Sequence, residues 1–199
     1  MMILRKFAIA LIALVLLGCF AKVPFAITDH SSKSYEQRDR TISTSYNRAS
    51  NQTINGDQYD DLNGLYIDLS YNAAAKDSFV TLSVTDRFNT LVRGHTFYDP
   101  MREISLLVND ETMIVIALEN GSKSYQSTDC DSEVGCSSDF SERAHGLLSL
   151  GDLAQLAQAK TVGIRVVGDQ LERSYKPSAI EADFILHIEQ FFSAVKAVK

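Results

Sequence analysis

The sequence predicts an α+β fold in which an antiparallel β-meander sheet is covered by a short helix and a longer amphipathic C-terminal helix. Two observations support this fold class. Short segments between residues 65 and 127 alternate apolar and polar residues, which is the pattern of half-buried strands. After Ser149 and Pro177, apolar residues recur instead at helical spacing. A chain of 199 residues has room for one domain with a sizeable core.

The first two predicted strands are "LYIDLSY" and "SFVTLSVT". Their alternation with period two places one set of side chains on a core face and the other set on a solvated face. The residues predicted to face the core are Leu65, Ile67, Leu69, Tyr71, Val80, Leu82 and Val84.

Three further strands are predicted in "EISLLV", "MIVIAL" and "KSYQS". Residues 109–112 separate the first two. Asn120 and Gly121 separate the second and third, and Asn-Gly between strand patterns is a strong hairpin signal because both residues accept positive φ. We therefore expect these segments to form a consecutive antiparallel meander.

The second half of the chain predicts two helices and one more hairpin. Ser149 and Asp152 resemble a capping box that opens the short helix, and "VGIRVV" and "QLERSY" form a hairpin across Gly168 and Asp169. Ser178 is expected to cap the C-terminal helix. One face of that helix is expected to cover the sheet and is lined by Ile180, Phe184, Ile188, Phe191 and Val195.

Residues 1–18 have the three-part pattern of an export signal. Arg5 and Lys6 precede an unbroken run of small and apolar residues, which is shorter than the roughly 20 residues needed to span a bilayer. Removal of this leader changes the formal net charge from −6 to −8. There are two alternatives to a lipoprotein signal peptide. One is ordinary signal cleavage after Ala21 or Ala26, and the other is an uncleaved inner-membrane anchor.

The four residues after the apolar run are Leu16-Leu17-Gly18-Cys19, and they resemble the lipobox of bacterial lipoproteins. The resemblance implies cleavage between Gly18 and Cys19, a diacylglyceryl group on the Cys19 thiol and acylation, for example by palmitate, of the new amino terminus. It also implies anchoring in a bilayer of the cell envelope. Phe20 follows the cysteine where an Asp would favour retention at the inner membrane. The resemblance therefore favours an outer membrane location facing the periplasm.

The sequence divides into three parts. Residues 1–18 are the signal peptide, residues 19–61 are expected to be a lipidated, disordered polar tether, and residues 62–199 are expected to form the single α+β domain. The tether is predicted because Ser, Thr, Asn, Gln and Asp dominate from residue 28 to residue 61, and such a segment buries little apolar surface.

Cys130 and Cys136 remain once Cys19 is lipidated, and an even pair at close spacing in an exported protein predicts a disulfide. Two reduced thiols and a zinc site are the alternatives. A zinc site would need two more ligands, and the local sequence has no His before His145.

No catalytic constellation, metal site or cofactor motif is predicted, and the acidic chain lacks the clustered Lys and Arg of nucleic-acid binding proteins. We therefore expect a non-catalytic binding or accessory module of the cell envelope, with a periplasmic or outer-membrane protein as its partner. One alternative is a hydrolase-like envelope enzyme that uses His95 and Asp99. Another is a carrier of small apolar ligands with a cavity beneath Phe184, Ile188 and Phe191.

Overall fold

The computed structural model describes residues 35–38, 40–51, 63–75, 77–90, 97–131 and 135–199, without the side chains of residues 89–90, 125–131 and 135–138. Lys33–Lys199 forms one compact unit. Its described residues form two antiparallel sheets and two α-helices, so the predicted α+β class is confirmed.

Sheet A has seven strands in the order β1-β2-β4-β5-β9-β8, and β3 also pairs with β4. Neighbouring strands are antiparallel throughout. The strands of sheet A are β1 (Tyr35–Arg38), β2 (Thr41–Thr44), β3 (Arg48–Ser50), β4 (Gly64–Asn72), β5 (Phe79–Thr90), β8 (Glu119–Asp131) and β9 (Gly135–Ser149).

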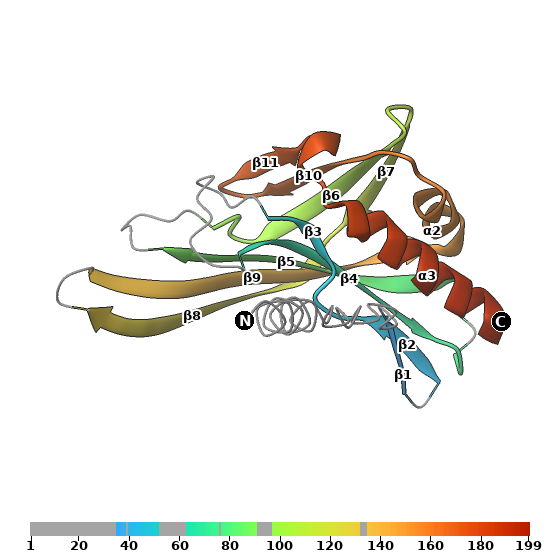
Figure 1. Cartoon of the computed structure of the whole chain (residues 1–199), viewed down its shortest axis with the longest axis horizontal. Helices are drawn as coiled ribbons and strands as arrows, with labels where there is room; N and C mark the ends of the chain where they lie inside the picture. The colour runs from blue at the N-terminus through green and yellow to red at the C-terminus, as the bar shows by residue number, and fades with distance from the viewer. Residues whose placement is uncertain (1–34, 39, 52–62, 76, 91–96, 132–134) are drawn as a thin grey trace, which may run out of the picture. The chain divides into compact units, whose positions relative to one another are not determined.

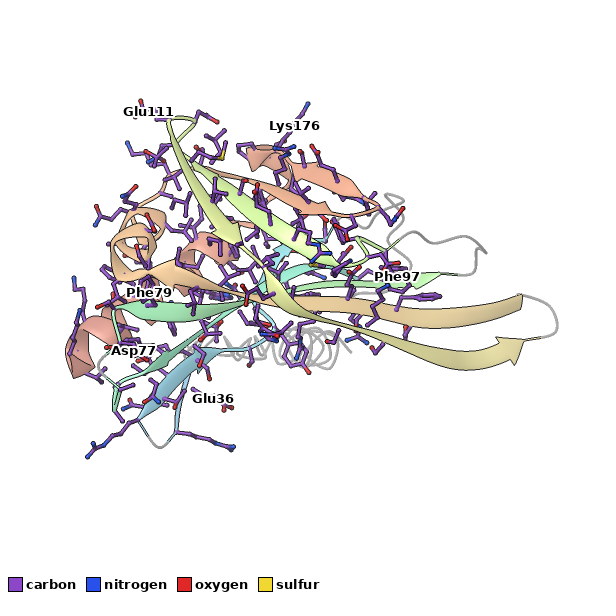
Figure 2. All side chains as sticks on the ribbon, turned by 180° about the vertical axis from the view of Figure 1, so that it is seen from behind. Glu36, Asp77, Phe79, Phe97, Glu111 and Lys176 are labelled. Atoms are coloured by element: carbon purple, nitrogen blue, oxygen red, sulfur yellow. The ribbon has the colours of Figure 1, made fainter. Side chains whose placement is uncertain are left out.

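Sheet B has four strands in the order β11-β10-β6-β7, and Figure 1 shows it above sheet A. Its strands are β6 (Met101–Val108), β7 (Thr112–Ala117), β10 (Val162–Gly168) and β11 (Glu172–Tyr175). The helices are α2 (Leu150–Ala157) and α3 (Ala182–Val198), and Pro177–Ala179 forms one 3-10 turn, η1. Figure 2 shows Glu111 at the tip of the β6–β7 hairpin.

One apolar core joins both sheets and both helices. The alternation of β4 and β5 places Leu65, Ile67 and Val80 in this core, as predicted, with 0% exposure each. Phe184, Ile188, Phe191 and Val195 on α3 are buried as predicted, whereas Ile180, the fifth residue of the predicted stripe, precedes α3 and is only partly buried. The burial of such large side chains contributes about 1.5–3 kcal/mol each.

The predicted disorder of the 19–61 tether is wrong for part of that segment. Residues 35–38, 41–44 and 48–50 form β1, β2 and β3 at the edge of sheet A. Two apolar side chains, Ile42 and Ala49, enter the core with 0% exposure. β2 and β3 pair with β4, and β1 pairs with β2, so the backbone polar groups are satisfied and these polar strands need few apolar residues.

The predicted hairpin at Asn120 and Gly121 is also wrong. β7 pairs with β6 in sheet B, whereas β8 pairs with β9 in sheet A, so the chain changes sheets near Leu118. Asn120 does adopt a positive φ of 55°, but it lies in a bulge between the pairs that Glu119 and Ser122 make with β9. The Asn-Gly pair therefore bends one strand and does not reverse the chain.

The start of the C-terminal helix differs from the predicted cap as well. Pro177–Ala179 forms the 3-10 turn η1, and α3 begins at Ala182 with Glu181 as its N-cap. The Glu181 carboxylate pairs with Arg48, at 2.6 Å between Nε and Oε1, and its backbone N–H donates to the Ala49 carbonyl. These contacts with β3 fix the helix start. Ser149, by contrast, caps α2 as predicted by accepting from the Asp152 N–H at 3.0 Å.

Candidate functional site

The face of sheet A turned away from the core is polar. β4, β5 and β9 alternate between core-facing and outward residues, and their register aligns the outward residues in rows across the sheet. In one row Tyr66 lies opposite Thr85, which lies opposite Arg143. In the next row Arg87 lies opposite Ser141.

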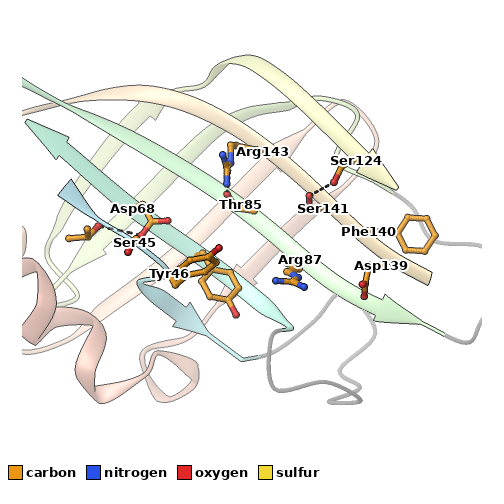
Figure 3. Close-up of a pocket in the computed structure, with 12 residues that line it drawn as sticks. Ser45, Tyr46, Asp68, Thr85, Arg87, Ser124, Asp139, Phe140, Ser141 and Arg143 are labelled. Atoms are coloured by element: carbon orange, nitrogen blue, oxygen red, sulfur yellow. Dashed lines mark hydrogen bonds between the residues drawn. The ribbon is translucent and has the colours of Figure 1, made fainter. Parts of the chain in front are cut away.

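A pocket of about 410 Å³ is hollowed into this face, and we call it the open-face groove (Figure 3). Its volume is within the usual range of small-molecule sites, although its lining is more polar than is common for them. It is lined by Thr44, Ser45, Tyr46, Tyr66, Asp68, Thr85, Arg87, Ser124, Asp139, Phe140, Ser141 and Arg143.

Two arginines from neighbouring strands reach the open-face groove. Arg87 and Arg143 are diagonal neighbours on one face, because Arg87 lies opposite Ser141, two residues before Arg143. Such neighbours have Cβ atoms about 7–8 Å apart, within reach of long side chains. Arg143 Nε donates to Thr85 Oγ1 at 3.1 Å, which orients its guanidinium. Arg87 has no hydrogen bond or ion pair with another described residue.

Asp68 lies in the same groove but is directed toward the backbone of the β2–β3 connection. Its Oδ1 accepts from the Asn47 backbone N–H at 3.0 Å and from Thr44 Oγ1 at 3.4 Å. Burial raises the pKa of this carboxyl, and the hydrogen bonds from Asn47 and Thr44 partly offset that effect. Asp68 therefore anchors the wall of the groove.

Tyr46 forms an exposed aromatic rim. It has a positive φ of 56°, which is uncommon for a bulky residue, and 76% of its surface is exposed. Its ring meets the buried Tyr66 ring edge-on, with centroids 6.4 Å apart. Exposed aromatic side chains on unusual backbone often belong to ligand-binding segments.

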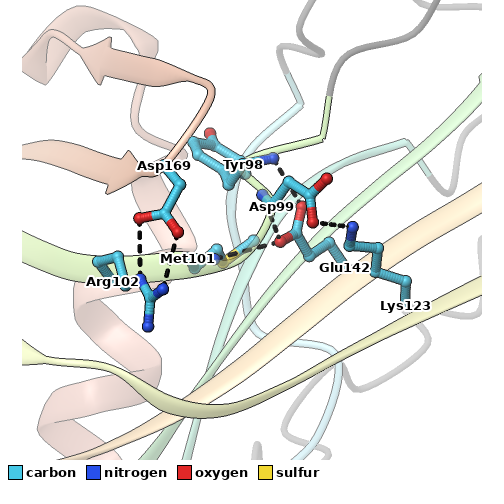
Figure 4. Close-up of polar contacts among 7 residues, drawn as sticks. All are labelled: Tyr98, Asp99, Met101, Arg102, Lys123, Glu142 and Asp169. Carbon is cyan, nitrogen blue, oxygen red and sulfur yellow. Dashed lines mark hydrogen bonds and ion pairs between the residues drawn. The ribbon is translucent and has the colours of Figure 1, made fainter.

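A second polar centre lies on the core side of sheet A, where Glu142 holds the segment that leads into β6 (Figure 4). The Glu142 carboxylate accepts from the backbone N–H groups of Tyr98, Asp99 and Met101 at 2.7, 3.0 and 3.2 Å. Glu142 is 1% exposed, so these three donors replace the water that the carboxylate loses. Its role is structural.

Asp86 lies directly opposite Glu142 in the β5–β9 register and is also 1% exposed. Neither of its carboxylate oxygens has a hydrogen-bond partner in the described part of the chain. Burial raises the pKa of Asp86 to about 7. Arg173 on β11 opposes this rise and the Glu142 charge adds to it. The hydroxyl-bearing rings of Tyr98 and Tyr175 also face this carboxyl, and their own pKa values are raised mainly by burial.

The structure tests little of the predicted His95–Asp99 pair. His95 lies outside the described residues. The Asp99 carboxylate forms an ion pair with Lys123 Nζ, and Lys123 also lies over the Phe97 ring at 5.3 Å. Figure 4 shows Asp99 and Lys123 directed toward each other.

The predicted cysteine chemistry lies mostly outside the described residues. Gly18 and Cys19 precede the described part of the chain, and the side chains of Cys130 and Cys136 are not described. The backbone places Cys130 directly opposite Cys136 in the β8–β9 pair. Opposite residues in antiparallel strands have the Cα separation that a disulfide requires, so the disulfide stays a prediction with compatible register.

Phe184, Ile188 and Phe191, which were predicted to cover a ligand cavity, have 0% exposure and pack in the common core. None of them lines the open-face groove or a second pocket of about 500 Å³. That second pocket lies between β7 and β9 and is lined in part by Val115 and Leu147.

The sequence alone does not reveal the residues of the open-face groove. Tyr66 and Asp68 were assigned to the solvated face of their strand, but nothing local indicated that Arg87 and Arg143, 56 positions apart, share that face. Among the described residues, no cluster of three or more His, Cys, Asp or Glu side chains is arranged to hold a metal ion.

No described helix has the length and apolar character needed to cross a membrane. No protein-family model matches the chain, and no curated protein matches it at a significant level. The case for a function therefore depends on the site itself.

Proposed function

We propose that this chain is a non-catalytic binding module of the bacterial cell envelope, with its ligand in the open-face groove. The observation that carries the proposal is the groove itself, about 410 Å³ in volume, with two arginines and an exposed tyrosine on a solvated sheet face. The apolar core lies on the opposite face of the sheet, so the two arginines and Tyr46 are not part of it.

The envelope location is part of the same proposal. The lipobox-like Leu16-Leu17-Gly18-Cys19 supports a lipid anchor on Cys19, with the outer membrane facing the periplasm as the favoured location. One acyl chain binds a bilayer only marginally, whereas two or more give stable anchoring. A periplasmic or outer-membrane component is therefore the expected partner.

Site-specific photo-crosslinking in intact bacteria tests the binding role. A benzoyl-phenylalanine replaces Tyr46 at the rim of the groove, and a matched variant carries it at Glu111, the exposed tip of the β6–β7 hairpin (Figure 2). Intact-mass spectrometry of the purified adducts measures what has been attached. We expect a discrete adduct from position 46 and none from position 111.

The size of the adduct also identifies the kind of ligand. A gain of a few hundred daltons indicates a small molecule, and a gain of many kilodaltons indicates a protein. The absence of any adduct from position 46, or the same adducts from both positions, would contradict the binding role.

The hydrolase alternative has weaker support. The Asp99 carboxylate is engaged by Lys123, and the Asp99 backbone N–H donates to Glu142, so the described contacts of this residue are structural. Turnover of an ester or peptide substrate by the purified chain, abolished by His95→Ala, would establish the enzyme instead.

A further inference from the structure

We infer that the ligand of the open-face groove is a small molecule that carries an oxyanion, a carboxylate or a phosphate, and that Arg87 and Arg143 hold it. This inference rests on the proposed binding function and specifies its chemistry. The groove volume of about 410 Å³ suits a small molecule.

Two arginines and two aspartates line the groove, so its formal charges balance, but neither arginine forms an ion pair with Asp68. Four charged residues line it, namely Arg87, Arg143, Asp68 and Asp139. Asp68 already accepts hydrogen bonds from Asn47 and Thr44, and burial raises its pKa while the charge of Arg143 partly offsets that rise. Asp139 has an interaction of its own. The unused hydrogen-bonding capacity therefore consists mainly of guanidinium N–H donors, which require an acceptor.

The two guanidinium groups are placed to act together. Arg87 and Arg143 project from neighbouring strands on the same face, and Figure 3 shows both beside the groove. The bond to Thr85 uses one of the five N–H donors of Arg143, which leaves its paired terminal donors for a ligand. Planar guanidinium groups bind carboxylate and phosphate oxygens in pairs, more strongly than they bind neutral acceptors.

The remaining polar groups fit the same ligand. Ser124 and Ser141 hydroxyls lie 2.7 Å apart at the Arg87 end of the groove and are bonded to each other. Tyr46 offers an aromatic face at the rim. A neutral sugar could use these groups, but it would supply no anionic acceptor for the terminal N–H donors of Arg87 and Arg143. A neutral ligand is therefore the competing outcome of the test.

Titration calorimetry on the full lipidated chain in neutral detergent tests this inference. The probes are citrate for carboxylates, pyrophosphate for phosphates and maltose as a neutral control. The variants are Arg87→Gln and Arg143→Gln, with Arg165→Gln as the control that removes the same charge on sheet B, where Arg165 pairs with Glu172.

We expect citrate or pyrophosphate to bind, and the probe that binds more tightly identifies the oxyanion. Because a hydrogen bond to a charged group is worth about 1.5–3 kcal/mol, each groove variant should weaken that binding by roughly tenfold or more. Arg165→Gln should change it less than twofold, and added salt should weaken binding to the unmodified chain.

Three results would overturn the inference: no binding of either anion, tighter binding of maltose, or equal losses in all three variants. The photo-adduct at position 46 separates this failure from failure of the proposed function. If the adduct persists in the Arg87→Gln, Arg143→Gln double variant, the binding role stands and the oxyanion is wrong. If the chain with both arginines intact gives no adduct at position 46, the binding role itself fails.

Discussion

The environment of Asp86 is costly to the folded state. Its carboxyl lies between Glu142, Arg173 and the rings of Tyr98 and Tyr175, and its oxygens have no hydrogen-bond partner among the described residues. A buried carboxylate without donors is unfavourable, so the proton is retained to higher pH. Folding stability is thereby linked to pH.

The first prediction concerns Asp86→Asn. The carboxyl ionises near pH 3.8 when exposed and near pH 7 in the folded chain, so the folded state holds the proton more tightly. The contribution of Asp86 to stability is therefore most favourable below about pH 4, falls between pH 4 and 7, and is lower by about 4 kcal/mol above pH 7. Asp86→Asn removes this dependence, and urea unfolding at pH 4.5 and 8 measures it.

The decisive quantity is the difference in the free energy of unfolding between Asp86→Asn and the unmodified chain. The buried Asn amide has a cost of its own, but that cost is the same at every pH. We expect that difference to shift in favour of Asp86→Asn by a few kcal/mol between pH 4.5 and 8. A difference that stays constant over this range would show that Asp86 does not titrate there.

The second prediction concerns Glu142→Gln. Three backbone N–H groups point at this buried carboxylate, and an amide accepts them with one oxygen and no charge. We expect a loss of about 2 kcal/mol or more in the free energy of unfolding. The exposed Glu172→Gln is the control and should lose much less. Equal effects would refute the clamping role of Glu142.

Much of the core was predictable at this scale, but the buried acids were not. The period-two pattern correctly placed Leu65, Ile67 and Val80 inside, because each strand carries that signal locally. Asp86 and Glu142 occupy core-facing positions of their strands, and only the β5–β9 register brings them together. Register is a long-range property that no local segment encodes.

Strand β7 crosses β9 at Gly146, and the contact requires a residue without a side chain. A Cβ at this position would lie 2.6 Å from Ile116 Cγ2 and 2.7 Å from the Ala117 carbonyl oxygen. Sheet B can therefore lie this close to sheet A only because residue 146 is glycine.

The third prediction compares Gly146→Ala with Gly151→Ala. The first variant forces β7 away from β9 and should destabilise the fold by about 1–3 kcal/mol. A Cβ on Gly151, in α2, meets only Ser149 Oγ at 3.7 Å, so the second variant should stabilise by about 0.5–1 kcal/mol. Thermal unfolding of both variants shows whether each change lowers or raises stability. Unchanged stability in Gly146→Ala would contradict the close crossing of β7 and β9.

The sequence predicted which strands and helices exist more reliably than it predicted which strands pair. The predicted strands, α2 and the apolar face of α3 all occur, since each has strong local periodicity. The change of sheet near Leu118 was hidden, because Asn120 and Gly121 suit a bulge as well as a hairpin. Strands β1–β3 and the central strand β9 were not predicted, because they depend on backbone pairing and much of their sequence is polar.

The fourth prediction concerns the whole chain and its proposed anchor. Cys19→Ser removes the sulfur that would carry the diacylglyceryl group, so we expect the protein to leave the membrane fraction. Cell fractionation and mass spectrometry of the N-terminus measure this outcome. If the chain that retains Cys19 begins at Lys22 or Ile27 and carries no lipid, lipidation is contradicted.

The site could not be predicted at the level of the whole molecule. The open-face groove draws its lining from five strands and the β2–β3 connection, which are far apart in the sequence. No local sequence signal marks its two arginines, which the β5–β9 register brings together. The groove is a product of topology, whereas the lipobox-like segment is a local signal and was visible at once.

The central claim is that the open-face groove is the binding surface, and threonine methyl NMR tests it most directly. The full chain, labelled at Thr methyl groups in detergent, is titrated with a small-molecule extract of the bacterial envelope. Thr44 and Thr85 report from the groove, and Thr112 on β7 reports from sheet B. We predict shifts at Thr44 and Thr85 with Thr112 unchanged. No shift at Thr44 and Thr85, or shifts confined to Thr112, would contradict the claim.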